Sequence, residues 1–209
     1  MANVPVAGTL FCSDGTEIPL YVASVAEGTE TNLTTSTQSN FTVSAAAVGT
    51  AFAGKTVTHC SPISATNGFA YAYILRAGQI INILPVGVAG ACGESKVQLC
   101  SSTQLIAGDQ VRVMTNTAAD RECALAVYTN RGQYHIFAVT PSGAAVNELV
   151  SILTGNGIGD TLQGQNITKA YCSIVGAVVA TKPSVQQPMI DMVNIPIGLN
   201  FQAQAITSA

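Results

Sequence analysis

The chain contains six cysteines and two histidines, the residue types that most often carry nucleophilic or metal chemistry. No two cysteines have the Cys-x-x-Cys or similar close spacing of a zinc site or a redox motif. Cys92 and Cys100 are near enough in sequence to bridge a hairpin, and the even number permits a full set of disulfides. We expect instead reduced, buried thiols that act as small hydrophobic side chains, with disulfides formed late in an exposed particle as the alternative. The six are Cys12, Cys60, Cys92, Cys100, Cys123 and Cys172.

Any catalytic triad would have to use one of the two histidines, His59 or His135. His59 directly precedes Cys60, but neighbouring residues on a strand point to opposite faces, so the two cannot act together as base and nucleophile. His135 falls in an alternating hairpin pattern, which favours a structural role. No Gly-x-Ser-x-Gly elbow or other nucleophile motif accompanies either histidine.

The eleven carboxylates are sparse and fall mostly in predicted turns, loops and strand ends. Asp120-Arg121-Glu122 is interpreted as a solvated turn. Nothing favours a pair of glycosidase carboxylates, although such residues can be distant in the chain. Gly155–Asp160 is glycine-rich but follows a predicted helix and lacks the lysine of a phosphate-binding loop. The sequence therefore predicts no catalytic, cofactor-binding or metal-binding residue, no cofactor and no enzyme.

Composition is the most informative property of these 209 residues. Charged residues make up 9% of the chain and hydrophobic residues 48%, whereas an ordinary domain carries roughly a quarter charged residues. One interpretation is a surface of uncharged Ser, Thr, Asn and Gln, as in many secreted β-proteins. We favour the other, in which much of the surface is buried against neighbouring subunits, because apolar content is raised while charge is lowered.

Charge and hydropathy also exclude several classes of partner. The net charge is −3 and the basic residues are scattered singly, so we expect no nucleic-acid binding, which needs several positive charges on one face. Every apolar run is interrupted before the roughly 18 residues of a membrane-spanning helix. Met1–Pro5 has no basic residue and no long apolar core, so we expect no secretory signal peptide. A small-molecule ligand is not expected either.

The stretch Ala70–Val88 is the clearest structural feature, with two apolar runs hinged on Arg76-Ala77-Gly78-Gln79. The Leu-x-Ala-Gly rhythm of this hinge returns at Leu105–Val113, and Leu162–Ile167 is a weaker echo. Only the turn and the start of the next strand recur, which favours a sandwich that reuses one turn chemistry over a solenoid or propeller. We expect the hinge to lack ionisable partners.

Other segments are predicted from turn residues and apolar periodicity. Gly8–Val22 and Cys123–Val139 are predicted hairpins, the first around Asp14-Gly15. Ala144–Leu153 is the best helix candidate and ends at Gly155. Glu27–Ser44 is Ser/Thr-rich and is interpreted as a loop or an edge strand, and Ala45–Gly54 fits either a short helix or a loop. Further strands are predicted at Thr56–Cys60, Lys96–Cys100, Gln110–Met114 and Ala170–Thr181.

These elements predict an all-β fold, either a β-sandwich or a jelly-roll-like antiparallel barrel, with at most one or two short helices. We expect one β-rich domain over residues 1–181, with an N-terminal hairpin and Ser/Thr-rich segment (1–54) and a main sandwich (55–181). Residues 182–209 are apolar and interrupted by prolines. A disordered tail would be polar, so we expect an extended C-terminal arm that crosses to a neighbouring subunit.

The turn Leu105–Val113 resembles one that is common in jelly-roll and related β-sandwich domains. In its Ala/Gly/Val/Thr-rich, charge-poor composition the whole chain is similar to virion structural proteins of phages and large DNA viruses. The resemblance implies a capsid or capsid-decorating (cement) subunit, a homo-oligomer that contacts itself and neighbouring capsid subunits in a virion assembled in the host cytoplasm. The alternative is a secreted or surface-displayed binding module, such as an adhesin, lectin or filament subunit.

Overall fold

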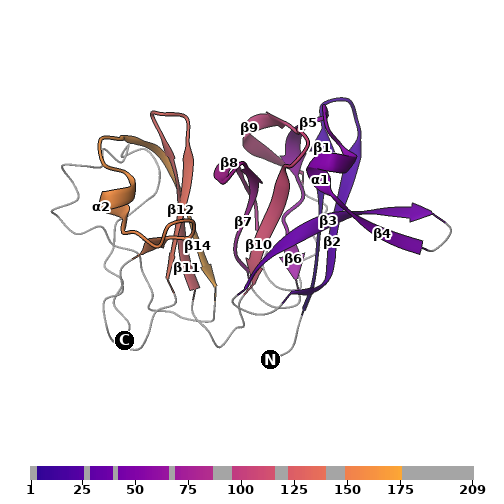
Figure 1. The fold of residues 1–209 in the computed structure, drawn as a ribbon, viewed down its shortest axis with the longest axis horizontal. Coiled ribbons are helices and arrows are strands. Elements are labelled where there is room, and N and C mark those ends of the chain that lie inside the picture. The colour runs from indigo at the N-terminus through magenta and orange to yellow at the C-terminus, as the bar shows by residue number, and fades with distance from the viewer. Residues whose placement is uncertain are drawn as a thin grey trace. The chain divides into compact units, whose positions relative to one another are not determined.

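The computed structural model describes residues 4–25, 29–39, 42–65, 69–86, 96–115, 122–139 and 149–175. Within these ranges the chain is mostly strand, with two helices of four residues each, so the predicted all-β, barrel-like or sandwich-like fold is confirmed. Contacts divide the chain into two compact units, Met1–Thr117 and Ala118–Ala209 (Figure 1). The arm predicted for residues 182–209 and the boundary before it lie outside the described residues.

The first unit is one curled antiparallel sheet. Its strands pair in the order β8-β7-β10-β3-β2-β1-β5-β9, while β4 pairs with β3 and β6 with β1. The elements are β1 (Val4–Cys12), β2 (Glu17–Val25), β3 (Glu30–Ser39), β4 (Thr42–Ala47), α1 (Val48–Ala51), β5 (Thr56–Cys60), β6 (Ser64–Ala65), β7 (Phe69–Arg76), β8 (Gln79–Leu84), β9 (Val97–Gln104) and β10 (Gln110–Thr115).

Two predicted hairpins of this unit are confirmed, and their turns explain why. Gly15 has φ +86° between β1 and β2, and Asp14 Oδ1 accepts a hydrogen bond of 3.0 Å from the Thr16 amide. Between β7 and β8 the chain reverses through Ala77 (φ +46°) and Gly78 (φ +78°). Positive φ at both central residues gives the twist that a two-residue hairpin requires.

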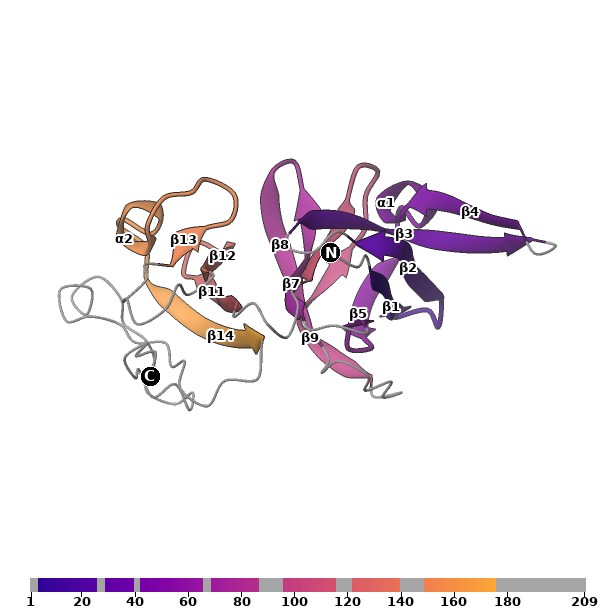
Figure 2. The same cartoon turned by 90° about the horizontal axis from the view of Figure 1, so that it is seen from below.

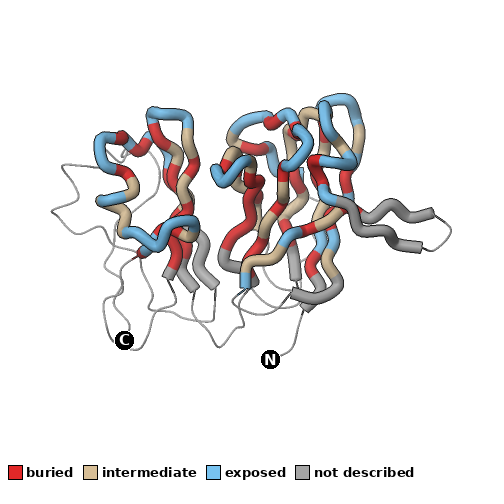
Figure 3. Tube along the Cα trace, viewed as in Figure 1, coloured by how far each residue is buried: buried red, intermediate tan, exposed pale blue. Residues whose placement is uncertain are grey.

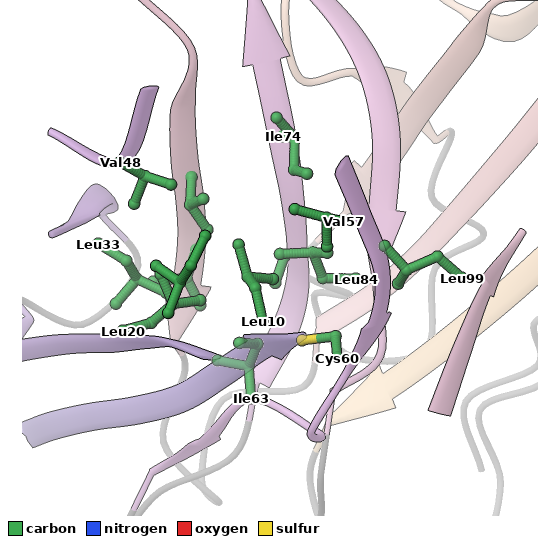
Figure 4. Packing of buried hydrophobic residues seen from close by; sticks show 14 of the residues in the cluster. Leu10, Leu20, Leu33, Val48, Val57, Cys60, Ile63, Ile74, Leu84 and Leu99 are labelled. Carbon is green, nitrogen blue, oxygen red and sulfur yellow. The ribbon is translucent and has the colours of Figure 1, made fainter. Parts of the chain in front are cut away.

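The inner face of the curled sheet carries the hydrophobic core of the first unit. Side chains from β1, β2, β3, β5, β7, β8 and β9 converge there (Figure 4), and buried positions recur along the strands (Figure 3). In β8, for example, Ile80, Asn82 and Leu84 are buried and alternate with less buried neighbours. The most deeply buried members include Leu10, Ile18, Val57, Cys60, Ile63, Ile74, Leu105, Val111 and Val113.

A buried side chain links the two ends of this strand order. Asn82 of β8 is fully buried, and its Nδ2 donates to the Ser101 carbonyl at 2.7 Å and to Thr103 Oγ1 at 2.9 Å, both on β9. Its Oδ1 accepts from the Ile83 amide at 3.0 Å. The amide group therefore closes the curled sheet by side-chain hydrogen bonds, and each of its polar atoms has a partner, as burial requires.

The second unit is a smaller antiparallel sheet. It contains β11 (Glu122–Thr129), β12 (Tyr134–Val139), β13 (Val150–Ser151), α2 (Ile158–Thr161) and β14 (Ile167–Val175), and its strands pair in the order β14-β11-β12-β13 (Figure 2). The predicted hairpin Cys123–Val139 is confirmed as β11 and β12. Its core consists of Leu125, Val127, Phe137, Leu149, Leu162, Ile167 and Ala170.

The helix predicted for Ala144–Leu153 is wrong over its described part, residues 149–153. Val150–Ser151 is the strand β13, with Ser151 opposite Phe137 of β12. Ser151 Oγ accepts the amides of Leu153 and Thr154, both at 3.3 Å, and so offers the backbone a turn in place of a helix. Pairing with β12 overrides the local helical periodicity.

For Glu27–Ser44 the edge-strand prediction holds and the loop alternative does not: the described residues form β3 and the start of β4, and β3 has strand partners on both edges only at Thr34 and Thr35. β10 pairs with Glu30–Leu33, and β2 pairs with Thr34 and Thr35. Leu33 is buried in the core and supplies the apolar contact that the polar sequence obscured. The ambiguous stretch Ala45–Gly54 completes β4 and then forms the single turn α1.

Gly49 of α1 packs closely on the connection between β9 and β10, and substituting it tests this packing. Its amide donates to the Asp109 carbonyl at 3.1 Å, and a Cβ there would lie 2.6 Å from the Asp109 nitrogen and against the Ile106 carbonyl. We expect Gly49→Ala to lower the free energy of unfolding by about 2 kcal/mol, since backbone cannot yield cheaply. Urea denaturation measures this. Gly159→Ala is the control, because nothing surrounds that Cβ, and an equal loss in both variants would contradict the packing argument.

Asn82→Ala tests the closure of the sheet. Removing the amide leaves the Ser101 carbonyl and Thr103 hydroxyl without their Asn82 donor, and we expect a loss of about 2 kcal/mol in unfolding free energy. Asn32→Ala removes an exposed partner of Arg112 and should change the same quantity by less than about 0.5 kcal/mol. Urea midpoints that fall equally in the two variants would show that Asn82 does not join β8 to β9.

Candidate functional site

The two Leu-x-Ala-Gly turns meet in the structure through an ion pair. β7 and β10 pair with Leu75 opposite Gln110, and this register, continued by one residue, places Arg76 opposite Asp109. Arg76 Nε donates to Asp109 Oδ1 at 2.8 Å, and Nη2 donates to Oδ2 at 2.7 Å. The absence of ionisable partners predicted for this hinge is therefore wrong, because the partner lies 33 residues downstream.

The Asp109 carboxylate is fully engaged at this position. Its side chain is 1% exposed, and Oδ2 also accepts from the Ile106 amide at 2.9 Å. Arg76 Nη2 donates in addition to the Gln104 carbonyl at the end of β9, at 2.6 Å. The hydrogen bond from Arg76 to Asp109 raises the pKa of the guanidinium. A bidentate pair with these further bonds fixes the ends of β7, β9 and β10 and leaves no obvious group for acid–base chemistry.

Two of the described thiols, Cys12 and Cys60, are poor nucleophiles. Burial raises the pKa of Cys60 to about 12, and Sγ donates to the Ser61 carbonyl at 2.9 Å. Burial, with the nearby Asp14 carboxylate, raises the pKa of Cys12. Because the thiolate is the reactive form, both groups are suppressed at neutral pH. Both are buried free thiols, as predicted, whereas Cys100 is only partly buried. Cys92 and the side chains of Cys123 and Cys172 lie outside the described residues.

The two histidines are far from a catalytic arrangement. Cys60 belongs to the core, whereas the half-buried His59 has Nδ1 2.9 Å from Thr58 Oγ1. The His135 ring stacks on Phe137 with centroids 6.4 Å apart, and burial lowers its pKa. This environment fits the predicted structural role of His135. Among the contacts of the described residues neither ring meets a thiol, and the hydroxyl beside His59 belongs to its own chain neighbour, Thr58.

The other residues considered for chemistry are not brought together. Asp120 and Arg121 lie outside the described residues. Gly155–Asp160 lies after β13, with φ +74° at Gly155, and its last three residues belong to the single turn α2. In the part of the chain that the structure describes, no three His, Cys, Asp or Glu side chains gather as metal ligands.

The described charges largely neutralise one another. Eleven charged side chains have a described environment, and six of them form the ion pairs Lys55–Asp14, Arg76–Asp109 and Arg112–Glu30. Lys96 lies 4.2 Å from the centre of the Phe11 ring. Glu17, Arg131, Asp160 and Lys169 complete the set. The described surface is therefore poor in unpaired charge.

The β3–β4 hairpin is the surface feature that sequence reasoning missed. β4 pairs with Thr34–Ser39 of β3, but β2 reaches only Thr34 and Thr35 on the opposite edge. Ser36–Ser39 and Thr42–Ala45 consequently pair with each other alone, and we call this part the ribbon. Both views show it projecting from the sheet (Figures 1 and 2). Residues 31–54 contain no charged side chain, which is the one indication the sequence offered.

No protein-family model, no curated protein and no solved structure matches the chain. Among the helices of the described residues, none is long and apolar enough to cross a membrane. The candidate functional site is therefore the ribbon and the charge-poor surface around it, because the three described ion pairs are engaged internally and the described residues gather no set of metal ligands.

Asp109→Ala tests whether the ion pair between the two turns is structural. It leaves Arg76 and the Ile106 amide without the carboxylate, and we expect a loss of about 3 kcal/mol in unfolding free energy, at the low end for a broken buried pair because Arg76 reaches water. Lys55→Ala removes the exposed pair with Asp14 while keeping the Asp14–Thr16 hydrogen bond of the turn, and should leave the urea midpoint nearly unchanged. Equal midpoints for Asp109→Ala and wild type would contradict the role given to Asp109.

Proposed function

We propose that the chain is a virion structural subunit, a capsid or capsid-decorating protein, which works by self-association. The observation that supports this most is the shortage of unpaired charge on an all-β body. Six of its eleven described charged side chains are consumed in internal ion pairs. Burying a charge-poor surface costs little desolvation free energy, since few charged groups must lose their water.

Apolar content points the same way. Hydrophobic residues make up 48% of the chain, and five large apolar side chains of the described residues are more than a third exposed. They are Tyr21, Val97, Ile106, Val150 and Leu153. Single exposed apolar residues are ordinary, but together with the low charge they leave little to oppose contact between copies.

The thiols fit assembly in a reducing compartment. Cys12 and Cys60 are buried free thiols of raised pKa, and such groups resist oxidation. A subunit that assembles in the host cytoplasm and then stays packed in a particle has no need of disulfides. This is the basis for assigning the chain to a virion rather than to an exported binding module.

Native mass spectrometry and negative-stain imaging of the purified chain test the proposal. We expect homo-oligomers, whose population grows with protein concentration, or particles built from them. A monodisperse monomer over the whole concentration range, with no binding to a particle, would contradict a structural role.

Titration of thiols in the unreduced, denatured protein distinguishes a subunit assembled in a reducing compartment from an exported binding module. We expect six reactive thiols per chain, because six cysteines are present and assembly in a reducing compartment oxidises none of them. Reduced protein is the control for a complete reaction. Loss of two or more thiols in freshly purified protein would favour an exported module over a cytoplasmic assembly.

A further inference from the structure

The ribbon has two open backbone edges. The outer edge of β4, from Thr42 to Ala47, faces no partner strand among the described residues, and neither does Ser36–Ser39 of β3 on the side where β2 has ended. A two-stranded hairpin alone is marginally stable in water. A projecting ribbon of this kind gains most from a strand added to its edge, because backbone hydrogen bonds then extend the sheet.

The ribbon carries none of the devices that protect an edge strand. Natural edges are commonly protected by Lys, other charges, Pro or bulges. Residues 31–54 contain no charged residue and no proline, and the β3–β4 register runs without a shift from the Thr34–Ala47 pair to the Ser39–Thr42 pair. The edge is left open to pairing.

We propose that β4 pairs with β4 of a second copy of this chain, antiparallel and across a two-fold axis, so that the two ribbons form a four-stranded sheet β3-β4-β4-β3. This names the contact surface for the self-association proposed above, and rests on it. An uncharged edge meets an identical edge without repulsion, and two-fold contacts between identical patches are the commonest in homo-oligomers.

Symmetry fixes the centre of this pairing. Opposite residues of antiparallel strands point to the same face of the sheet, and a two-fold axis normal to the sheet preserves faces. A residue at the axis must therefore lie opposite itself. The middle of β4 places the axis at Ser44 or Ala45, where the two copies' Cα atoms would be about 4.5–5.5 Å apart.

Single cysteines at the axis test this geometry. Ser44→Cys and Ala45→Cys are oxidised mildly in separate samples and run on a non-reducing gel, with wild type as the control for the native thiols. We expect a disulfide-linked dimer with at least one of them, since disulfides need Cα atoms about 4.4–6.8 Å apart. Thr42→Cys is the matched control. With the axis at Ser44, Thr42 lies two residues to one side of the axis and Thr42 of the second copy lies two residues to the other side, so the two cysteines would be about 14 Å apart along the strands. This variant should stay monomeric on the gel.

The outcomes separate this inference from the proposed function. If wild type assembles but neither axis cysteine cross-links, the β4 contact is overturned while self-association stands. A donor strand from another protein gives the same monomeric gel and likewise overturns it. A wild type that never leaves the monomer contradicts both.

A charge exchange at Ser44 gives a second readout that a folding defect would not imitate. Ser44→Lys and Ser44→Glu should each shift the equilibrium about three- to fivefold toward the monomer, because like charges would face one another across the axis. Mixing the two variants should restore the dimer as a Lys–Glu heterodimer. Unchanged dimerisation in both variants, or no recovery on mixing, would contradict the pairing.

Discussion

A β-strand presents hydrogen-bonding groups along both edges. The architecture of the first unit depends on which of these edges are paired and which stay open. β8 and β9, at the two ends of the strand order, are joined by the buried Asn82 side chain instead of a backbone ladder. The curl that brings them together encloses the core. It also leaves the β3–β4 ribbon outside the closed part of the sheet, with its backbone edges open. The proposed function depends on the part of the sheet that stays open.

The repeated Leu-x-Ala-Gly turn is the second organising device. Its first copy ends in Arg76-Ala77-Gly78, and its second contains Asp109 directly after the glycine. Sheet register places the two copies side by side, so that the bidentate ion pair fixes both turns. α1 then packs Gly49 against the backbone of the second turn. Polar groups that resemble a site in the sequence are used here to hold turns in place.

Local signals predicted much of the fold, and non-local ones explain the rest. Asp14-Gly15 and Ala77-Gly78 encode their turns in two residues, so both hairpins followed from the sequence. Val150–Ser151 forms a strand because it pairs with β12, and the local sequence pattern around residue 150 does not reveal this partner. The partner of Arg76 could be found only through strand register. The ribbon depends on where β2 stops pairing with β3, which no local pattern records.

Amide hydrogen exchange over Thr42–Ala47 tests the central claim most directly, because it measures the open edge itself. In dilute monomer, the amides of β4 that do not pair with β3 should exchange rapidly. In the assembled state, these same amides should be strongly protected, since each would donate to the neighbouring copy. Equally fast exchange in monomer and assembly would show that the edge of β4 is not the contact, and would contradict the account.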